Sequence, residues 1–262
     1  MKKIKCQAWM LAVLCFLYGA ASLFAADHHP IGGPLGSSNS HAAKNNPVPG
    51  YDSVLVRKFT AAIRSLDFNR TTCTYSGTVN LNDPNDPANT PQHIPFLFCR
   101  LKGDYYYRVA GTEIIHSDHM NISILHNQRK VVISSQQMAI HPLTQGTDSI
   151  MKRLAFENYQ LKSRVKGTSQ IISIVNEKHI TCKELSVTLD AASGKLERIY
   201  SRFTDFGSPM DKGLDRVMDV KINILSKSAD RKLYPSAADV VRMHHGKWQL
   251  TGKYATYELI ML

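Results

Sequence analysis

The feature that most constrains the fold is a strict alternation of side-chain character through residues 72–81. Every odd-numbered position there is apolar or Gly, and every even-numbered position is small and polar. Because successive side chains of a β-strand point to opposite faces, the alternation predicts a strand with one buried and one solvated face. The next segment, 82–92, contains Pro84, Pro87 and Pro91, which exclude a helix or a central strand there and predict a loop.

Strand-like runs continue through most of the remaining chain. We predict a first group at 94–101, 105–110, 113–116, 121–125 and 129–135, and a second at 159–166, 170–175, 180–189, 196–204 and 217–225. The chain closes with two more, at 248–250 and 256–262. Breaks of two to four residues separate the strands of the first group, which is typical of an antiparallel meander. Gly194 favours a hairpin turn at 191–194, since glycine adopts positive φ at little steric cost.

Helical signals are few. Leu55, Phe59 and Ile63 recur at helical spacing after Asp52, a residue type that caps helix N-termini, and predict an amphipathic helix over 53–66. Shorter helices are predicted at 148–156 and after the capping-box spacing of 236–239. Alternating βα units are absent, which argues against a parallel doubly wound sheet. We therefore predict an α+β fold for residues 52–262: a strongly curved antiparallel β-sheet or open β-barrel with a few helices against its concave face.

The N-terminal segment has the organisation of a secretory signal peptide. Lys2, Lys3 and Lys5 precede an apolar run that ends in small residues at Ala25 and Ala26. We predict cleavage near Ala25, which leaves a flexible Gly-, Pro- and His-rich leader at 26–51 and no transmembrane segment. The protein is then exported by a bacterium and is periplasmic or associated with the outer envelope.

The net charge of the chain is +11, and it falls to about +8 once residues 1–25 are removed. An excess of this size is usual for a solvated surface, and it also allows affinity for an anionic envelope component. No compact Lys/Arg block is present, so nucleic acid is not an expected partner.

Three cysteines remain after signal cleavage. Cys73 and Cys99 fall on consecutive predicted strands, so one disulfide and one leftover thiol, Cys182, are compatible with the sequence. Three buried free thiols are the other interpretation, because free Cys packs as a small hydrophobe.

Motifs of the common enzyme classes are missing: the sequence has no Gly-x-Ser-x-Gly, no H-E-x-x-H and no phosphate-binding glycine loop. We therefore favour a protein that is not an enzyme, and we predict no cofactor. His116, Asp118 and His119 gather two imidazoles and a carboxylate at a predicted turn, and a neighbouring strand could bring His126 close to them. Solvated turn residues are the favoured interpretation of this cluster, and a metal site is the alternative.

His28 offers a second metal hypothesis. If the mature chain begins at Ala26, His28 is its third residue, and the terminal amine, two amides and the imidazole can bind Cu(II) or Ni(II) in a square plane.

An apolar ligand cavity is also compatible with the sequence. Aromatic and aliphatic residues of neighbouring predicted strands would line it: Phe96, Phe98, Tyr105, Tyr107, Met120, Ile122 and Ile124. The same residues would form an ordinary packed core if the inner face is filled.

The leading helix, the curved antiparallel strands and the strand–turn–strand at 183–189, 191–194 and 196–203 together resemble the LolA/LolB-like superfamily of periplasmic lipoprotein carriers and receptors. That resemblance concerns architecture over residues 52–262, and it implies an unclosed barrel capped by helices around a cavity for lipoprotein acyl chains. No motif transfers a functional residue. The sequence also resembles exported proteins of Bacteroidetes-type bacteria.

Three functions remain open from the sequence. The first is a non-enzymatic exported protein that binds a hydrophobic ligand, such as a lipid or lipoprotein acyl chain, or a cell-envelope partner. The second is a metal-binding or metal-dependent enzyme that uses His116, Asp118 and His119. The third is a structural envelope component without a ligand.

Overall fold

The computed structural model describes residues 50–66, 70–117, 120–135, 152 and 154–262. The expected signal peptide and nearly all of the expected leader, including His28, lie outside these residues. Among the described residues, no helix combines the length and hydrophobicity needed to cross a membrane.

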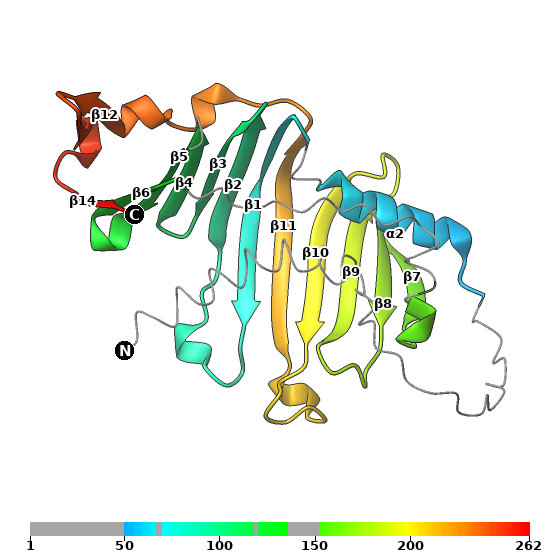
Figure 1. Ribbon diagram of the computed structural model, residues 1–262. Helices are drawn as coiled ribbons and strands as arrows, with labels where there is room; N and C mark the ends of the chain where they lie inside the picture. Colours follow the sequence, from blue (N-terminus) through cyan, green and yellow to red (C-terminus); the bar gives the residue numbers. More distant parts are fainter. Residues whose placement is uncertain (1–49, 67–69, 118–119, 136–151, 153) are drawn as a thin grey trace, which may run out of the picture.

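One large sheet organises the described chain (Figure 1). Its first strands are β1 (Thr72–Asn82), β2 (Ile94–Leu101), β3 (Asp104–Val109), β4 (Thr112–Ser117), β5 (Met120–Leu125) and β6 (Lys130–Ser134). The later strands are β7 (Gln160–Lys166), β8 (Ser169–Val175), β9 (Cys182–Asp190), β10 (Leu196–Phe203), β11 (Arg216–Ser226) and β14 (Glu258–Met261). These bounds agree with the predicted strands of both groups to within a few residues.

The strand order is β14-β6-β5-β4-β3-β2-β1-β11-β10-β9-β8-β7. The sheet thus consists of two meanders joined where β1 pairs with β11. Every neighbouring pair is antiparallel except β14, which runs parallel to β6 because the chain returns to the sheet edge after a long excursion. The predicted curved, unclosed sheet with few helices is confirmed, and the sheet is mixed rather than wholly antiparallel.

Helix α2 (Ser53–Ser65) covers one face of the β7–β10 half (Figure 1). The Asp52 carboxylate accepts hydrogen bonds from the backbone N–H groups of Val54 and Leu55, at 2.8 and 3.3 Å, and so caps the helix N-terminus. Phe59 and Ile63 lie on the buried side of the helix, as their spacing predicted. Of the shorter helix expected at 148–156, residues 152 and 154–156 are described and helical.

The C-terminal excursion covers the opposite face at the other end of the sheet. It contains the 3-10 turns η4 (Arg231–Leu233), η5 (Ala237–Asp239) and η6 (Gly252–Tyr254), and a small hairpin of β12 (Val241–His244) and β13 (Lys247–Leu250). The capping box at Ser236 and Asp239 is present. Strand β12 was not predicted.

The sheet therefore separates two hydrophobic cores. The larger lies beneath α2 and contains Phe59, Tyr75, Val187 and Val220. The smaller lies beneath the C-terminal excursion and contains Tyr106, Ile122, Val131 and Tyr254. Strands β2 and β3 contribute alternate side chains to both cores, which explains their nearly continuous burial.

The three described cysteines are free and buried. Thr74, not Cys73, lies opposite Cys99 in the β1–β2 register, so the two cysteine side chains point to opposite faces and belong to different cores. A bond between Cys73 and Cys99, one of the two sequence interpretations, is therefore wrong for this fold. Burial raises the pKa of all three thiols, and that of Cys182 to about 12.

Candidate functional site

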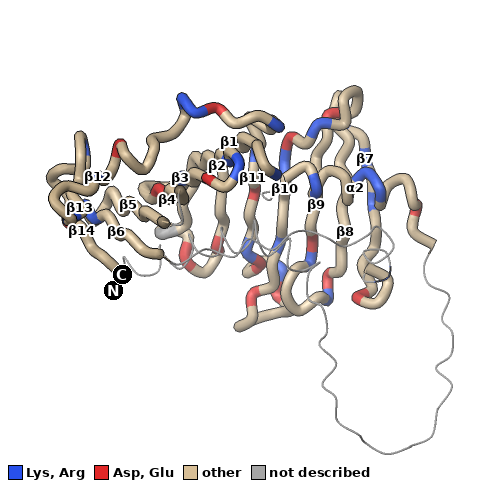
Figure 2. Tube along the Cα trace, turned by 45° about the horizontal axis from the view of Figure 1, so that its top comes forward, with Lys and Arg blue, Asp and Glu red and all other residues tan. Residues whose placement is uncertain are grey.

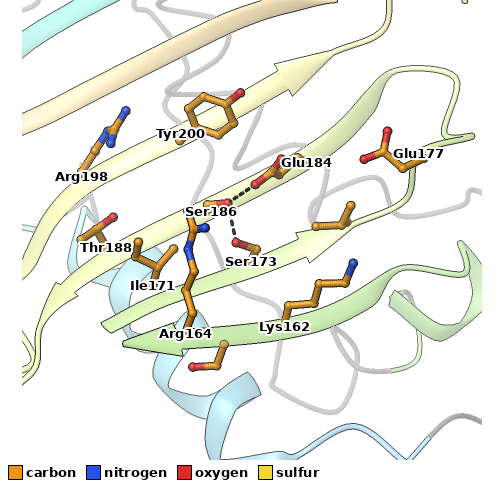
Figure 3. A pocket seen from close by; sticks show the side chains of 12 residues that line it. Lys162, Arg164, Ile171, Ser173, Glu177, Glu184, Ser186, Thr188, Arg198 and Tyr200 are labelled. Carbon is orange, nitrogen blue, oxygen red and sulfur yellow. Dashed lines mark hydrogen bonds between the residues drawn. The ribbon is translucent and has the colours of Figure 1, made fainter. Parts of the chain in front are cut away.

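An open hollow lies on the face of β7–β10 that is opposite to α2 (Figure 3). Its volume is about 630 Å³. The lining alternates with the core residues of the same strands: Ser173 and Ser186 face the hollow, while Ile172 and Val187 face α2. The residues that line it are Lys162, Ser163, Arg164, Ile171, Ser173, Val175, Glu177, Glu184, Ser186, Thr188, Arg198 and Tyr200.

A chain of hydroxyl groups runs across the floor of the hollow. The Ser173 and Ser186 hydroxyl oxygens are 2.7 Å apart, and the Ser186 hydroxyl donates to a Glu184 carboxylate oxygen at 2.7 Å. Figure 3 shows the Ser173–Ser186 bond crossing from β8 to β9 and the Ser186–Glu184 bond within β9. The Glu184 carboxylate also lies 3.7 Å from the Arg202 guanidinium, so its charge is already compensated within the protein.

The carboxylate at one end of the hollow is engaged as well. Glu177 accepts hydrogen bonds from Arg202 and lies 3.2 Å from the Lys212 ammonium group, and the Arg202 bond is the main cause that holds the pKa of Glu177 below its usual value. Arg202 also donates to the buried Asp215 carboxylate at 2.8 Å, which in turn accepts from Lys183 at 2.7 Å. This network closes that end of the hollow and fixes β9, β10 and the segment before β11.

Among the cations of the hollow, Arg198 is paired and two others are not. Arg198 makes a double hydrogen bond to the Asp219 carboxylate. Lys162 and Arg164 make no ion pair or hydrogen bond with the described residues. Figure 3 shows these two side chains on β7, at one side of the hollow, and Arg198 and Tyr200 on β10, at the other. Because Glu177 and Glu184 are already paired with other cations, Lys162 and Arg164 give the hollow an excess of positive charge.

Apolar surface completes the lining. Ile171 and Val175 of β8 and the ring of Tyr200 lie among the polar groups. Burial raises the pKa of Tyr200, so its hydroxyl stays protonated and can donate a hydrogen bond across the neutral pH range. The arrangement can hold a negatively charged group against Lys162 and Arg164, with hydroxyl donors and a modest apolar surface beside it.

A second polar cluster lies between the sheet and the C-terminal excursion. The buried Glu113 carboxylate accepts a hydrogen bond from Tyr106 at 2.9 Å and lies 2.7 Å from Nε2 of His126. Nδ1 of His126 lies 3.0 Å from the hydroxyl of Tyr257. Burial first, and then the Glu113 charge, raises the pKa of Tyr106. Each member of this cluster is bonded to another, so it fastens the excursion to the sheet rather than presenting free groups to a ligand.

The residues predicted to line an apolar cavity are divided between the two faces of the sheet. Phe96, Phe98, Tyr105 and Tyr107 are buried on the α2 side. Ile122 and Ile124 are buried in the second core, and Met120 packs against that core. The predicted lining residues therefore form two separate sets, one on each face of the sheet, and neither set lines the hollow over β7–β10.

The predicted metal ligands are only partly described. His116 stacks on Tyr105 with ring centroids 4.9 Å apart, and its Nδ1 is 2.8 Å from the side-chain oxygen of Asn121. Asp118 and His119 lie outside the described residues. His126 bonds to Glu113 instead, on the other face of the sheet. Within the described ranges, no group of three or more His, Cys, Asp or Glu side chains is arranged to hold a metal ion.

Sequence reasoning missed the hollow, although one signal pointed to it. Residues 160–166 carry cations at every second position, Lys162, Arg164 and Lys166, and a strand places those three side chains on one face. That Arg202 already holds the carboxylates of this hollow became visible only in the folded sheet. Elsewhere in the described chain Lys and Arg are spread among acidic residues, without a single basic block (Figure 2).

No protein-family model matches the sequence, and no curated protein matches it. Solved structures that match include a chain of the Pseudomonas aeruginosa MucA/MucB complex, with 14% identity, a TM-score of 0.38 and coverage of 70% of this chain. This chain spans 62% of the length of that one. A LolA superfamily protein from Nitrosomonas europaea also matches, with 9% identity and a TM-score of 0.28 over 71% of this chain and 97% of the other. The resemblance to the LolA superfamily stays a prediction, and no residue role is transferred from either structure.

Proposed function

We propose that this protein is an exported binding protein that recognises an anionic envelope partner in the hollow over β7–β10. The observation that carries the proposal is the pair of cations, Lys162 and Arg164, which face an open, partly apolar hollow and have no acidic partner among the described residues. The neighbouring carboxylates Glu177 and Glu184 are already held by Arg202. An anion that enters the hollow therefore meets positive charge and hydroxyl donors rather than repulsion.

The test uses anilinonaphthalene sulfonate, a small fluorescent anion with an apolar body, as the probe. We expect saturable binding to the native protein, weakened about fivefold in the double variant Lys162→Gln/Arg164→Gln, because two exposed charge pairs of about 0.5 kcal/mol each together contribute about 1 kcal/mol.

The matched control is Arg57→Gln/Lys232→Gln, which removes one Arg and one Lys outside the hollow lining and should bind the probe like the wild type. Equal affinity of both double variants would refute the hollow as an anion site.

The hydrophobic-ligand hypothesis from the sequence stays a prediction. The Lys162→Gln/Arg164→Gln variant distinguishes it from the anion-site proposal. Native mass spectrometry of the protein purified from its own envelope would reveal a bound lipid. A lipid retained by Lys162→Gln/Arg164→Gln would place the ligand away from the hollow and favour the apolar residues around Phe98 or Ile122.

A further inference from the structure

The hollow is bordered by an open edge of the sheet. Strand β7 is the last strand on this side, and within the described residues its sole sheet neighbour is β8. Gly167, with φ of 59°, and Thr168 form a two-residue turn between β7 and β8. Such a turn closes on a hydrogen-bonded pair, which here is Lys166 and Ser169.

That closing pair sets the direction of every backbone group in β7. Hydrogen-bonded and non-hydrogen-bonded pairs alternate along an antiparallel hairpin. Lys162 and Arg164 therefore direct their N–H and C=O groups towards β8, while Leu161, Ser163 and Val165 direct theirs away from it. Every residue of β7 except Leu161 is exposed, and Val165 is 70% exposed, so this outward row is accessible. A row of outward N–H and C=O groups is a template for one more strand.

The side chains of β7 decide which strand can be added. Lys162, Arg164 and Lys166 share the face that borders the hollow, one cation at every second residue. Residues of an added strand that lie opposite these positions share that face, because directly opposed residues of a strand pair point the same way. Carboxylates at alternate positions of the added strand would then each meet a cation.

The same cations disfavour pairing between two copies of this chain. Two β7 edges would bring three positive charges against three, and like charges directly opposite one another destabilise a strand pair. The other edge of the sheet has a different character. Strand β14 has four residues, and these include the acidic Glu258 and no cation. Of the two edges, β7 is therefore the one suited to selective recognition of an acidic strand.

We propose that the partner is a polypeptide whose extended segment, with acidic residues at alternate positions, adds as a strand to the outer edge of β7. Its carboxylates pair with Lys162 and Arg164, and its other side chains lie on the α2 side of the edge. This inference rests on the proposed function, because it uses the same cations, and adds to it the backbone of β7 as a binding element.

The experiment measures binding of a synthetic peptide in which Glu alternates with Val, by fluorescence anisotropy with the full-length protein. A peptide of the same composition with its Glu residues contiguous is the sequence control. We expect the alternating peptide to bind at least about tenfold more tightly than the contiguous one, because only alternation places its carboxylates on one face.

Two substitutions at Val165 isolate the backbone contribution. Val165→Pro removes an outward N–H without breaking a bond to β8, and an edge strand tolerates such a proline. We expect it to reduce peptide affinity at least about tenfold while anilinonaphthalene sulfonate binding is unchanged. Val165→Ala keeps the N–H and should bind the peptide like the wild type.

The outcomes separate the two proposals. Loss of dye binding in Lys162→Gln/Arg164→Gln together with equal affinity for both peptides, or unchanged peptide binding by Val165→Pro, overturns strand addition and leaves the anion site standing. Unchanged dye binding in Lys162→Gln/Arg164→Gln overturns the anion site, and the strand inference with it.

Discussion

At the residue scale, the buried lysine of β9 is a charged group that needs a counter-charge inside the protein. Lys183 lies where the register of β9 shifts against β10, and it is 1% exposed. Its ammonium group is 2.7 Å from the Asp215 carboxylate and 2.8 Å from the carbonyl oxygen of Pro209. Asp215 also accepts from Arg202, but Arg202 has Glu177 and Glu184 as further partners, whereas Asp215 is the carboxylate that pairs with Lys183.

We predict that Asp215→Asn lowers the free energy of unfolding by about 3–5 kcal/mol, since it leaves a buried cation without a counter-charge. Urea unfolding followed by circular dichroism measures the change. Glu258→Gln is the control: it breaks the exposed pair with Lys130, at 3.3 Å, and should cost at most about 1 kcal/mol. A loss for Asp215→Asn no larger than the control would show that the buried pair is not what holds β9 to the segment before β11.

At the element scale, Gly77 is the point where the two meanders are joined. The β1–β11 register shifts between Ser76 and Gly77, so a bulge lies there. A Cβ atom on Gly77 would lie 1.9 Å from the carbonyl oxygen of Lys221 and 2.8 Å from the Phe96 ring. Glycine is therefore required at residue 77 because β11 approaches β1 closely there. The alternating pattern of β1 predicts which face residue 77 occupies, but it does not reveal this close approach.

We predict that Gly77→Ala destabilises the protein by about 1–3 kcal/mol, through displacement of β11 from β1. Thermal unfolding measures the loss. Gly103→Ala serves as the control, because an added Cβ at that turn meets nothing within 4 Å. Equal stability of the two variants would mean that the β1–β11 junction adapts without cost.

At the scale of the whole molecule, two cores on opposite faces share one sheet. Phe59 anchors α2 to the first core, and Tyr254 anchors the C-terminal excursion to the second. The hollow lies behind the first core, on the uncovered face of the same strands. Its floor therefore depends on α2 for rigidity although α2 contributes no lining residue.

We predict that truncating each anchor loosens a different half of the sheet. Phe59→Ala should raise amide hydrogen exchange in β7–β10, and Tyr254→Ala should raise it in β4–β6 and β14, with each truncation costing about 3–5 kcal/mol. Hydrogen-exchange mass spectrometry resolves the two halves. The same exchange pattern for both variants would show that the cores unfold as one unit.

The sequence by itself determined the elements. Alternation at 72–81 and in the later runs set the strands, and the Asp52 cap with the 3.6-residue spacing of Phe59 and Ile63 set α2, because these periods follow from backbone geometry within each element. Only the tertiary structure decided which strands became neighbours, that Cys73 and Cys99 face apart, and that Phe98 and Ile122 lie in different cores. It also decided that β14 runs parallel to β6 and that Lys162 and Arg164 have no acidic partner in the described part of the chain. Those outcomes depend on strand order and on which face each segment covers, and such contacts between distant residues leave no local period in the sequence.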